Sequence, residues 1–320
     1  MAKIGYTFTP VIQRLFVSGP NTNGVLGLGD VVNRSSPTQI GTLSTWQQVS
    51  IGSNANSAGG VKLDGTLWMW GLNSNGQLGL SDIVHRSSPV QVGSLTNWSQ
   101  VSCMVSATLA IKTDGTIWSW GSNTGQLGQN DAISRSSPTQ IGLLTNWNQI
   151  SCSASACASI KTNNSLWTWG ANNLGQLGLS TGATGLAYSS PTQVGTLTNW
   201  QTVSVGYTHM ASIKTDGTLW IWGDNTYGQL GLNDLVNRSS PVQLGSFNTW
   251  KYVSSGNYTT FGIQTNGSLW SWGFNTQGEL GQSDIVHRSS PTQIGALTNW
   301  ASLSAGVDAE YAFKTDGSLW

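Results

Sequence analysis

The stretch Trp68-Met69-Trp70-Gly71 decides the fold, because the pattern Trp-x-Trp-Gly returns at intervals of about fifty residues. A degenerate copy, Phe16-Val17-Ser18-Gly19, lies near the N-terminus. A period in this range indicates an array of small structural units. The other full copies are Trp118-Ser119-Trp120-Gly121, Trp167-Thr168-Trp169-Gly170, Trp220-Ile221-Trp222-Gly223 and Trp270-Ser271-Trp272-Gly273.

The segments around this motif predict strands and turns. Thr66 to Trp70 is short, β-branched and aromatic, which is typical of a strand, and it is apolar on both faces. A strand that is buried on both sides needs a sheet packed between two other sheets. Asp64-Gly65 upstream predicts a two-residue type I′ hairpin. The Ser-Ser-Pro run ending at Pro89 predicts an edge strand, because proline cannot donate to a strand ladder.

Each unit therefore holds four strands, and four-stranded antiparallel sheets at this period predict an all-β fold, a β-propeller. The chain opens in a third strand, 15–19, and closes on a second strand followed by Leu319-Trp320. This arrangement predicts a ring closed by N- and C-terminal strands that share a blade, with six blades by repeat count. Residues 1–320 are expected to form one propeller domain, with 1–12 as an N-terminal extension.

Composition narrows the function. Charged residues make up only 8% of the 320 residues, and the formal net charge is zero. No apolar run is long enough to span a membrane, and the N-terminus lacks the apolar region of a secretory signal. With three cysteines, a disulfide framework is not expected. The absence of a basic stripe argues against nucleic-acid binding.

The charges that are present follow the repeat. Asp and Arg recur four positions apart before Ser-Ser-Pro, and Lys and Asp recur two positions apart across the hairpin. Both sets are expected to be solvated structural pairs, each worth under about 1 kcal/mol. They are Asp30/Arg34, Asp82/Arg86, Asp131/Arg135, Asp234/Arg238, Asp284/Arg288, Lys62/Asp64, Lys112/Asp114, Lys214/Asp216 and Lys314/Asp316.

The run Gly-x-Asn-x-x-Gly-Gln-Leu-Gly after Trp-x-Trp-Gly, with Asp-Gly upstream, resembles the regulator of chromosome condensation repeat family from about Leu15 to Trp320. The resemblance implies a propeller, usually of seven blades, so six blades is a departure. The founding member is an exchange factor for a small GTPase and uses a β-wedge and a basic tail. Neither feature is found in this sequence.

Scaffold positions agree between units, whereas functional loops need not. The most divergent segment joins the first and second strands of each unit, and it should line one rim of the propeller. Aromatic side chains beside carboxylates there are suited to anchoring a protein or glycan partner, although neutral drift would also produce such divergence. The rim candidates are Tyr207, His209, Asn257, Tyr258, Asp308 and Glu310.

The remaining features of the sequence are one expanded loop and the cysteines. The expanded loop 181–188 lacks the Asp and Arg of the other units and is expected to expose Leu186 and Tyr188, as a subunit contact or as a neutral insertion. Cys103 and Cys152 occupy the same register and are interpreted as small buried residues, since metal-ligand spacing is missing. No catalytic, cofactor or metal site is predicted.

The sequence therefore favours a non-enzymatic propeller that binds other macromolecules through one rim. Its charge-poor surface suggests a structural protein in a virion or another exposed assembly rather than in the nucleus. A regulator that resembles an exchange factor for a small GTPase and a secreted-type inhibitor or lectin are the alternatives.

Overall fold

The computed structural model describes residues 14–41, 45–52, 54, 56–181, 187–306 and 310–320. The chain divides into two compact units, an N-terminal unit up to Ile150 and a C-terminal unit from Ser151 to Trp320. The boundary falls inside one strand, β11. Twenty-four strands and no helical element are found in these ranges, so the predicted all-β class is confirmed.

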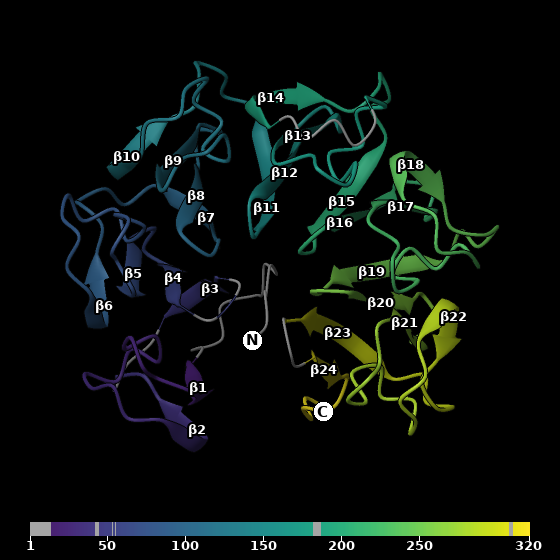
Figure 1. The fold of residues 1–320 in the computed structure, drawn as a ribbon. Helices are drawn as coiled ribbons and strands as arrows, with labels where there is room; N and C mark the ends of the chain where they lie inside the picture. The colour runs from purple at the N-terminus through teal and green to yellow at the C-terminus, as the bar shows by residue number, and fades with distance from the viewer. Residues whose placement is uncertain (1–13, 42–44, 53, 55, 182–186, 307–309) are drawn as a thin grey trace. The chain divides into compact units, whose positions relative to one another are not determined.

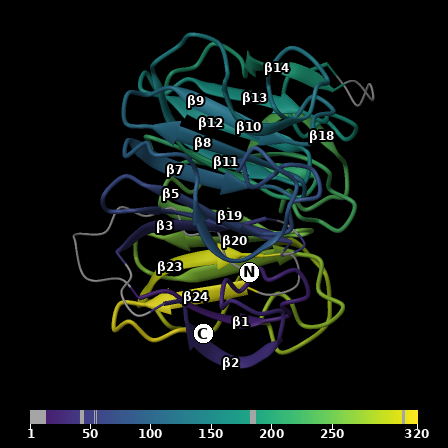
Figure 2. The same cartoon turned by 90° about the vertical axis from the view of Figure 1, so that its left-hand side faces the viewer.

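The strands of the N-terminal unit form one two-stranded and two four-stranded sheets (Figure 1). The two-stranded sheet holds β1 (Phe16–Gly19) and β2 (Arg34–Gln39). The first full sheet holds β3 (Trp46–Ile51), β4 (Ser57–Lys62), β5 (Leu67–Gly71) and β6 (Arg86–Gln91). The next holds β7 (Trp98–Cys103), β8 (Ala107–Lys112), β9 (Ile117–Gly121) and β10 (Arg135–Gln140). Figure 2 shows this last sheet from the side.

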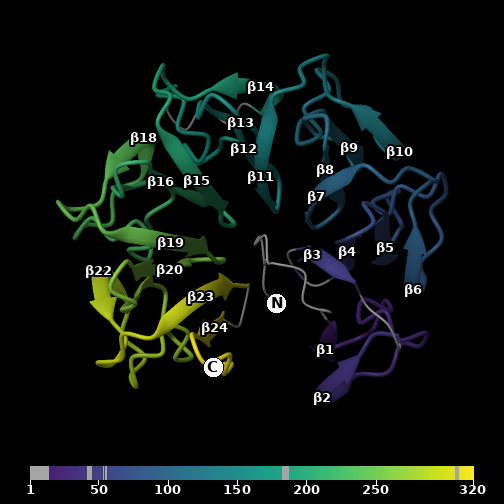
Figure 3. The same cartoon turned by 180° about the vertical axis from the view of Figure 1, so that it is seen from behind.

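The remaining strands form three four-stranded sheets and one two-stranded sheet (Figure 3). The first holds β11 (Trp147–Ser153), β12 (Ala156–Lys161), β13 (Leu166–Gly170) and β14 (Tyr188–Gln193). The second holds β15 (Trp200–Val205), β16 (His209–Lys214), β17 (Leu219–Gly223) and β18 (Arg238–Gln243). The third holds β19 (Trp250–Ser255), β20 (Thr259–Gln264), β21 (Leu269–Gly273) and β22 (Arg288–Gln293). The last holds β23 (Trp300–Ala305) and β24 (Glu310–Lys314).

Within every full sheet the strands pair antiparallel in chain order, and the Ser-Ser-Pro strand lies at the outer edge. This confirms the predicted four-stranded unit and the predicted edge position of the proline strand. β1–β2 carries the third and fourth strands of a unit, and β23–β24 carries the first and second. The six-bladed closed ring and the single domain stay predictions.

The Asp-Gly hairpin differs from the predicted type I′ turn. Only Gly65 of the pair has a positive φ, at +77°, and its N–H donates to the carbonyl of Lys62 at 2.9 Å. The turn therefore spans residues 62–65, and its last residue, Gly65, forms a glycine bulge. Asp64 accepts from the N–H and the hydroxyl of Thr66, so it caps the turn. Its side chain fixes the hairpin in a way that the type I′ interpretation missed.

The two tryptophans of each Trp-x-Trp-Gly strand have different surroundings. The first is half-buried, and the second is fully buried. The buried indole donates Nε1–H to a main-chain carbonyl in the loop that follows the third strand of the preceding sheet, at 2.8–2.9 Å. These pairs are Trp70 with Val25, Trp120 with Gln77, Trp222 with Gln176 and Trp272 with Gln229. These four buried indoles therefore join successive repeats.

The two sets of charge pairs behave differently. Each predicted Asp–Arg pair is an ion pair, with Nη2–Oδ2 distances of 2.5–2.7 Å. Hydrogen bonds from Arg135 and from the N–H of Ile133 lower the pKa of Asp131 to about 2. The predicted Lys–Asp pairs do not form ion pairs. The ion pairs found in the described ranges are all between arginine and aspartate. Lys112 Nζ lies 3.7 Å from the ring centre of Trp118, so its partner is an indole.

Candidate functional site

The divergent loops of the C-terminal unit bring two predicted rim residues together. Tyr207 precedes β16, and Tyr258 precedes β20, so both occupy loops between a first and a second strand. Their ring centres are 6.3 Å apart in an edge-to-face arrangement. Tyr207 is 37% exposed, whereas Tyr258 is half-buried. Two of the rim candidates, from neighbouring repeats, therefore lie in contact.

Three further rings, Tyr227, Phe274 and His287, extend this pair into a cluster. The ring of Tyr227 lies 5.2 Å from that of Tyr258 and 4.9 Å from that of Phe274. Phe274 stacks on His287, with ring centres 4.9 Å apart and an angle of 26°. We call Tyr207, Tyr227, Tyr258, Phe274 and His287 the aromatic rim. It is a contiguous cluster of five rings, three of which carry a hydroxyl group, and such amphipathic rings are frequent in protein interfaces.

A buried carboxylate holds the base of the aromatic rim. Asp224 follows the Trp-x-Trp-Gly strand β17 directly and is 4% exposed. It accepts hydrogen bonds from the N–H and hydroxyl of Thr226, from Nε2 of Gln229 and from the hydroxyl of Thr208. These bonds connect the loop of Tyr207 to the loop of Tyr227. Burial, followed by the proximity of Tyr207, Asp224 and Tyr227, raises the pKa of Tyr258.

His209 does not lie on the surface, which corrects its place among the rim candidates. It is the first residue of β16 and is fully buried. Thr260 donates its hydroxyl to the carbonyl of Gln229, so it accepts from His209 Nε2, which lies 2.8 Å away. Its Nδ1 is buried and meets no hydrogen-bond partner among the residues that the structure describes. Burial lowers the pKa of His209 to about 4, although nearby Asp224 opposes the shift.

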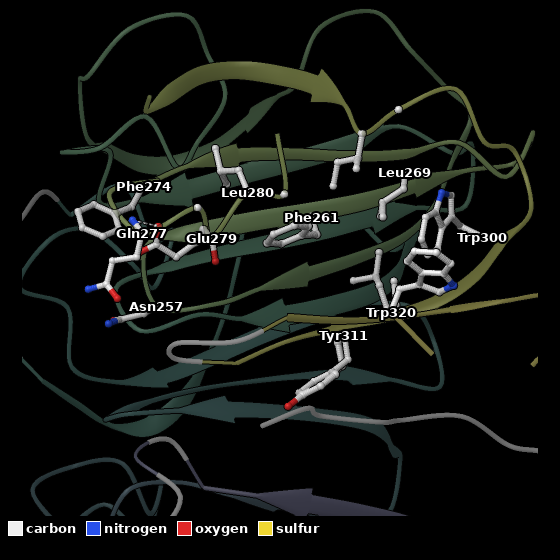
Figure 4. Close-up of a pocket in the computed structure, with 18 of the residues that line it drawn as sticks. Asn257, Phe261, Leu269, Phe274, Gln277, Glu279, Leu280, Trp300, Tyr311 and Trp320 are labelled. Carbon is white, nitrogen blue, oxygen red and sulfur yellow. Dashed lines mark hydrogen bonds between the residues drawn. The ribbon is translucent and has the colours of Figure 1, made fainter. Parts of the chain in front are cut away.

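A pocket of about 850 Å³ lies beside the aromatic rim (Figure 4). Asn257, Gln277 and Phe274 stand at one end of it, and Trp300 and Trp320 stand at the other. Apolar side chains of β20 and β21 and of the following loop line the space between them, including Phe261, Leu269 and Leu280. A pocket of this volume with a few polar groups is typical of a binding site.

The remaining predicted positions have four different outcomes. Asn257 is half-buried and lines the pocket rather than standing on the open rim. Asp308 and Leu186 lie outside the described residues, and Glu310 begins β24. Tyr188 differs from the expected exposed ring. It is half-buried against a hydrophobic cluster, and its hydroxyl bonds to Thr181 at 3.2 Å.

Tyr188 and Thr181 together replace the ion pair of the other units. Tyr188 begins β14 where an arginine begins β6, β10, β18 and β22, and Thr181 accepts from Asn172 as the aspartates do elsewhere. A neutral hydroxyl pair thus keeps the loop connected. Within the described part of loop 181–188, the substitutions have a structural explanation.

Tyr227, Phe274 and Asp224 escaped the sequence analysis, although the sequence contained a signal. The residue after Trp-x-Trp-Gly reads Leu72, Ser122, Ala171, Asp224 and Phe274 in the five units. That position diverges as strongly as the loops between first and second strands. The rim is built from two loops of each of two neighbouring repeats, one between the first and second strands and one after the third strand.

No metal centre is formed in the ranges that the structure describes, where no three His, Cys, Asp or Glu side chains gather to hold an ion. Cys103, Cys152 and Cys157 are buried, as predicted for the first two. The same ranges contain no helix long and apolar enough to cross a membrane.

Comparison with known proteins identifies the family. The model of the RCC1-like domain matches residues 11–312. The X-linked retinitis pigmentosa GTPase regulator of Canis lupus familiaris is 38% identical over 90 residues, 27% of this chain and 9% of that protein. The ultraviolet-B receptor UVR8 of Arabidopsis thaliana is 29% identical over 228 residues, 69% of this chain and 51% of the receptor. The chain thus spans under a tenth of the first relative and about half of the second.

A solved structure agrees with this assignment. Yeast RCC1 (Prp20), in a complex with Kap60, superposes with a TM-score of 0.83 over 100% of this chain and 79% of that chain. The sequences are 18% identical, so the likeness shows the fold alone. The fold is that of a β-propeller built from four-stranded blades. Since the family model matches nearly all of the sequence, the chain belongs to the RCC1-like domain family.

Proposed function

We propose that this chain is a binding protein without catalytic chemistry of its own, and that it contacts a protein partner through the aromatic rim. The observation that carries this proposal is the five-ring cluster on loops that differ between units, beside strands that agree. Aromatic side chains with polar tips concentrate binding energy at interfaces because they bury large areas with few rotatable bonds.

The rim can be tested by capture from native material with a double variant, Tyr207→Ala and Tyr258→Ala. We expect partner affinity to fall by at least about thirtyfold, since interface hot spots cost about 2 kcal/mol or more each. Val105→Ala is the matched control, because Val105 occupies the repeat position of Tyr207 in the sheet β7–β10.

The control variant should capture the same partner as the unaltered chain. Thermal unfolding of all three proteins, followed by circular dichroism, shows whether the scaffold is intact. Equal capture by the double variant and the unaltered chain would remove the aromatic rim as the contact surface.

A role as a GTPase regulator is the alternative. It is favoured by the 38% identity to a protein named as a GTPase regulator, over 90 residues. Acceleration of GDP release from small GTPases by the purified chain would support it. Unchanged release, together with a partner of another class captured through the rim, would favour the scaffold function. A glycan partner would instead be recognised by competition with free sugars.

The predicted setting in a virion or another exposed assembly rests on composition alone, because only 8% of the residues are charged. The binding function proposed for the rim does not depend on that setting. Capture from native material tests both, because it identifies the assembly together with the partner.

A further inference from the structure

The carboxylate at the base of the aromatic rim has only neutral partners. Asp224 is 4% exposed, and both of its oxygens accept hydrogen bonds, as an ionised carboxylate does. Its donors are a main-chain N–H, two hydroxyls and an amide. The ion pairs of the described ranges join other aspartates to arginines, and Asp224 belongs to none of them. The site therefore holds a buried negative charge that no cation of the described residues neutralises.

This charge lies close to the three tyrosines of the rim. The N–H of Asp224 donates to the carbonyl of Thr208 at 3.0 Å, and the hydroxyl of Thr208 donates back to its carboxylate at 3.1 Å. Thr208 directly follows Tyr207, and Tyr227 comes three residues after Asp224. The pKa of Tyr258 is raised first by burial and then by neighbouring groups that include Asp224. The carboxylate therefore acts on the rings that the rim presents.

The other charges of the loops 224–238 and 274–288 do not cancel this one. Each loop contains one Asp–Arg pair, which is neutral as a whole, and Glu279 has the same sign as Asp224. The position of Asp224 holds an uncharged residue in four other repeats, namely Leu72, Ser122, Ala171 and Phe274. The repeat folds without a carboxylate here, so the charge needs an explanation other than the scaffold.

Elsewhere in the chain, aromatic rings of this kind are paired with a cation. In five hairpins a lysine Nζ lies 3.6–3.8 Å from the ring centre of a half-buried or exposed tryptophan: Lys62 with Trp68, Lys112 with Trp118, Lys161 with Trp167, Lys214 with Trp220 and Lys314 with Trp320. The electron-rich face of each ring attracts the ammonium group. In the described ranges, no lysine or arginine lies over a ring of the aromatic rim.

We propose that the aromatic rim binds a cationic side chain of its partner protein, the guanidinium of an arginine or the ammonium of a lysine. The cation lies over the exposed ring of Tyr207, next to Tyr258, and Asp224 supplies the opposite charge from below. Because Asp224 is buried and its oxygens are already hydrogen-bonded, it acts through space and not by direct contact. This inference rests on the proposed function, since it names the chemistry of the partner at the same rim.

The test uses the full chain labelled with 3-fluorotyrosine and followed by fluorine NMR, which reports on each of its seven tyrosines. The probes are Nα-acetylarginine amide, Nα-acetyllysine amide and Nα-acetylcitrulline amide, the last being the uncharged analogue of the first. We expect saturable shifts at Tyr207 and Tyr258 with at least one of the two cations, at least about fivefold tighter than with citrulline. Tyr252 should not respond, because Lys251 Nζ already lies 5.2 Å from its ring centre.

Asp224→Asn should weaken binding of the cation by at least about threefold, since it removes the charge and leaves the rings. Asp216→Asn is the matched control. It removes one negative charge from the same sheet, and Asn163 and Asn266 make the equivalent hydrogen bonds in other repeats. Thermal unfolding by circular dichroism checks both variants, and the comparison with citrulline needs no substitution at all.

Equal binding of the cationic and citrulline probes, or no shift at Tyr207 and Tyr258, would overturn the proposal. Unchanged binding by folded Asp224→Asn protein would refute the role of the carboxylate. If the cations fail to bind while the double variant Tyr207→Ala and Tyr258→Ala loses its native partner, the cation is refuted and the rim function stands. If the cations bind but the double variant captures the partner normally, the proposed contact surface is refuted instead.

Discussion

Replacing Trp222 with alanine is expected to lower the free energy of unfolding by about 3–5 kcal/mol, the range for a large aromatic side chain removed from a core. Trp222 is fully buried among Leu177, Val194 and Trp200. Its Nε1–H also donates to the carbonyl of Gln176 at 2.9 Å, a bond that alanine cannot make. Unfolding in urea, followed by tryptophan fluorescence and circular dichroism, measures the change.

Trp220→Ala in the same strand is the matched control. Trp220 is half-buried, its Nε1–H donates to the hydroxyl of Thr218, and Lys214 Nζ lies 3.6 Å from its ring centre. Trp220 buries less apolar area than Trp222 on folding. Its replacement should therefore lower the free energy of unfolding by less than about half of the loss at Trp222. Equal losses at the two positions would contradict the distinction between the indole that joins units and the indole that covers its own hairpin.

The stability of the chain should fall as pH decreases from about 6.5 to about 4, because of His209. Its pKa is lowered to about 4 by burial. Between these values the unfolded chain binds a proton at this residue and the folded chain does not, so acid favours unfolding. At 1.36 kcal/mol for each pKa unit, the full effect is about 3 kcal/mol. Urea unfolding at a series of pH values measures it.

His209→Thr should remove this part of the pH dependence, since Thr259 occupies the same register in the next sheet. His85→Asn is the control, because asparagine fills that position as Asn33 and Asn237 and accepts the same N–H. Asp residues with lowered pKa values also destabilise the fold in acid, so the difference between variants is the relevant quantity. An unchanged pH dependence in His209→Thr would refute the assignment.

The strands of the fold could be predicted because the same apolar and turn residues recur in five copies of the repeat. Leu67, Trp68, Met69 and Trp70 show the third strand directly, and Pro89 places the edge strand. The hairpin was less predictable. Asp-Gly suits both a type I′ turn and a turn followed by a glycine bulge, and the choice depends on the hydrogen bond from Gly65 to Lys62.

Only part of the candidate site could be predicted from the sequence. Tyr207 and Tyr258 differ from the residues at the equivalent positions of other repeats, whereas His209 is buried and hydrogen-bonded to Thr260 of a neighbouring sheet. Sequence cannot distinguish a loop residue that faces solvent from one that turns inward at the start of a strand. Tyr227 and Phe274 belong to the rim because two loops converge there, and this convergence in space could not be predicted from the sequence.

Hydrogen-exchange mass spectrometry of the chain with its captured partner tests the binding function most directly. If the partner binds the aromatic rim, we expect slower amide exchange in the segments 206–209, 224–228, 256–259 and 273–275 when the partner is present. The double variant Tyr207→Ala and Tyr258→Ala should show no such protection. Protection confined to the outer strands β6, β10, β18 or β22, with the rim unchanged, would contradict the account.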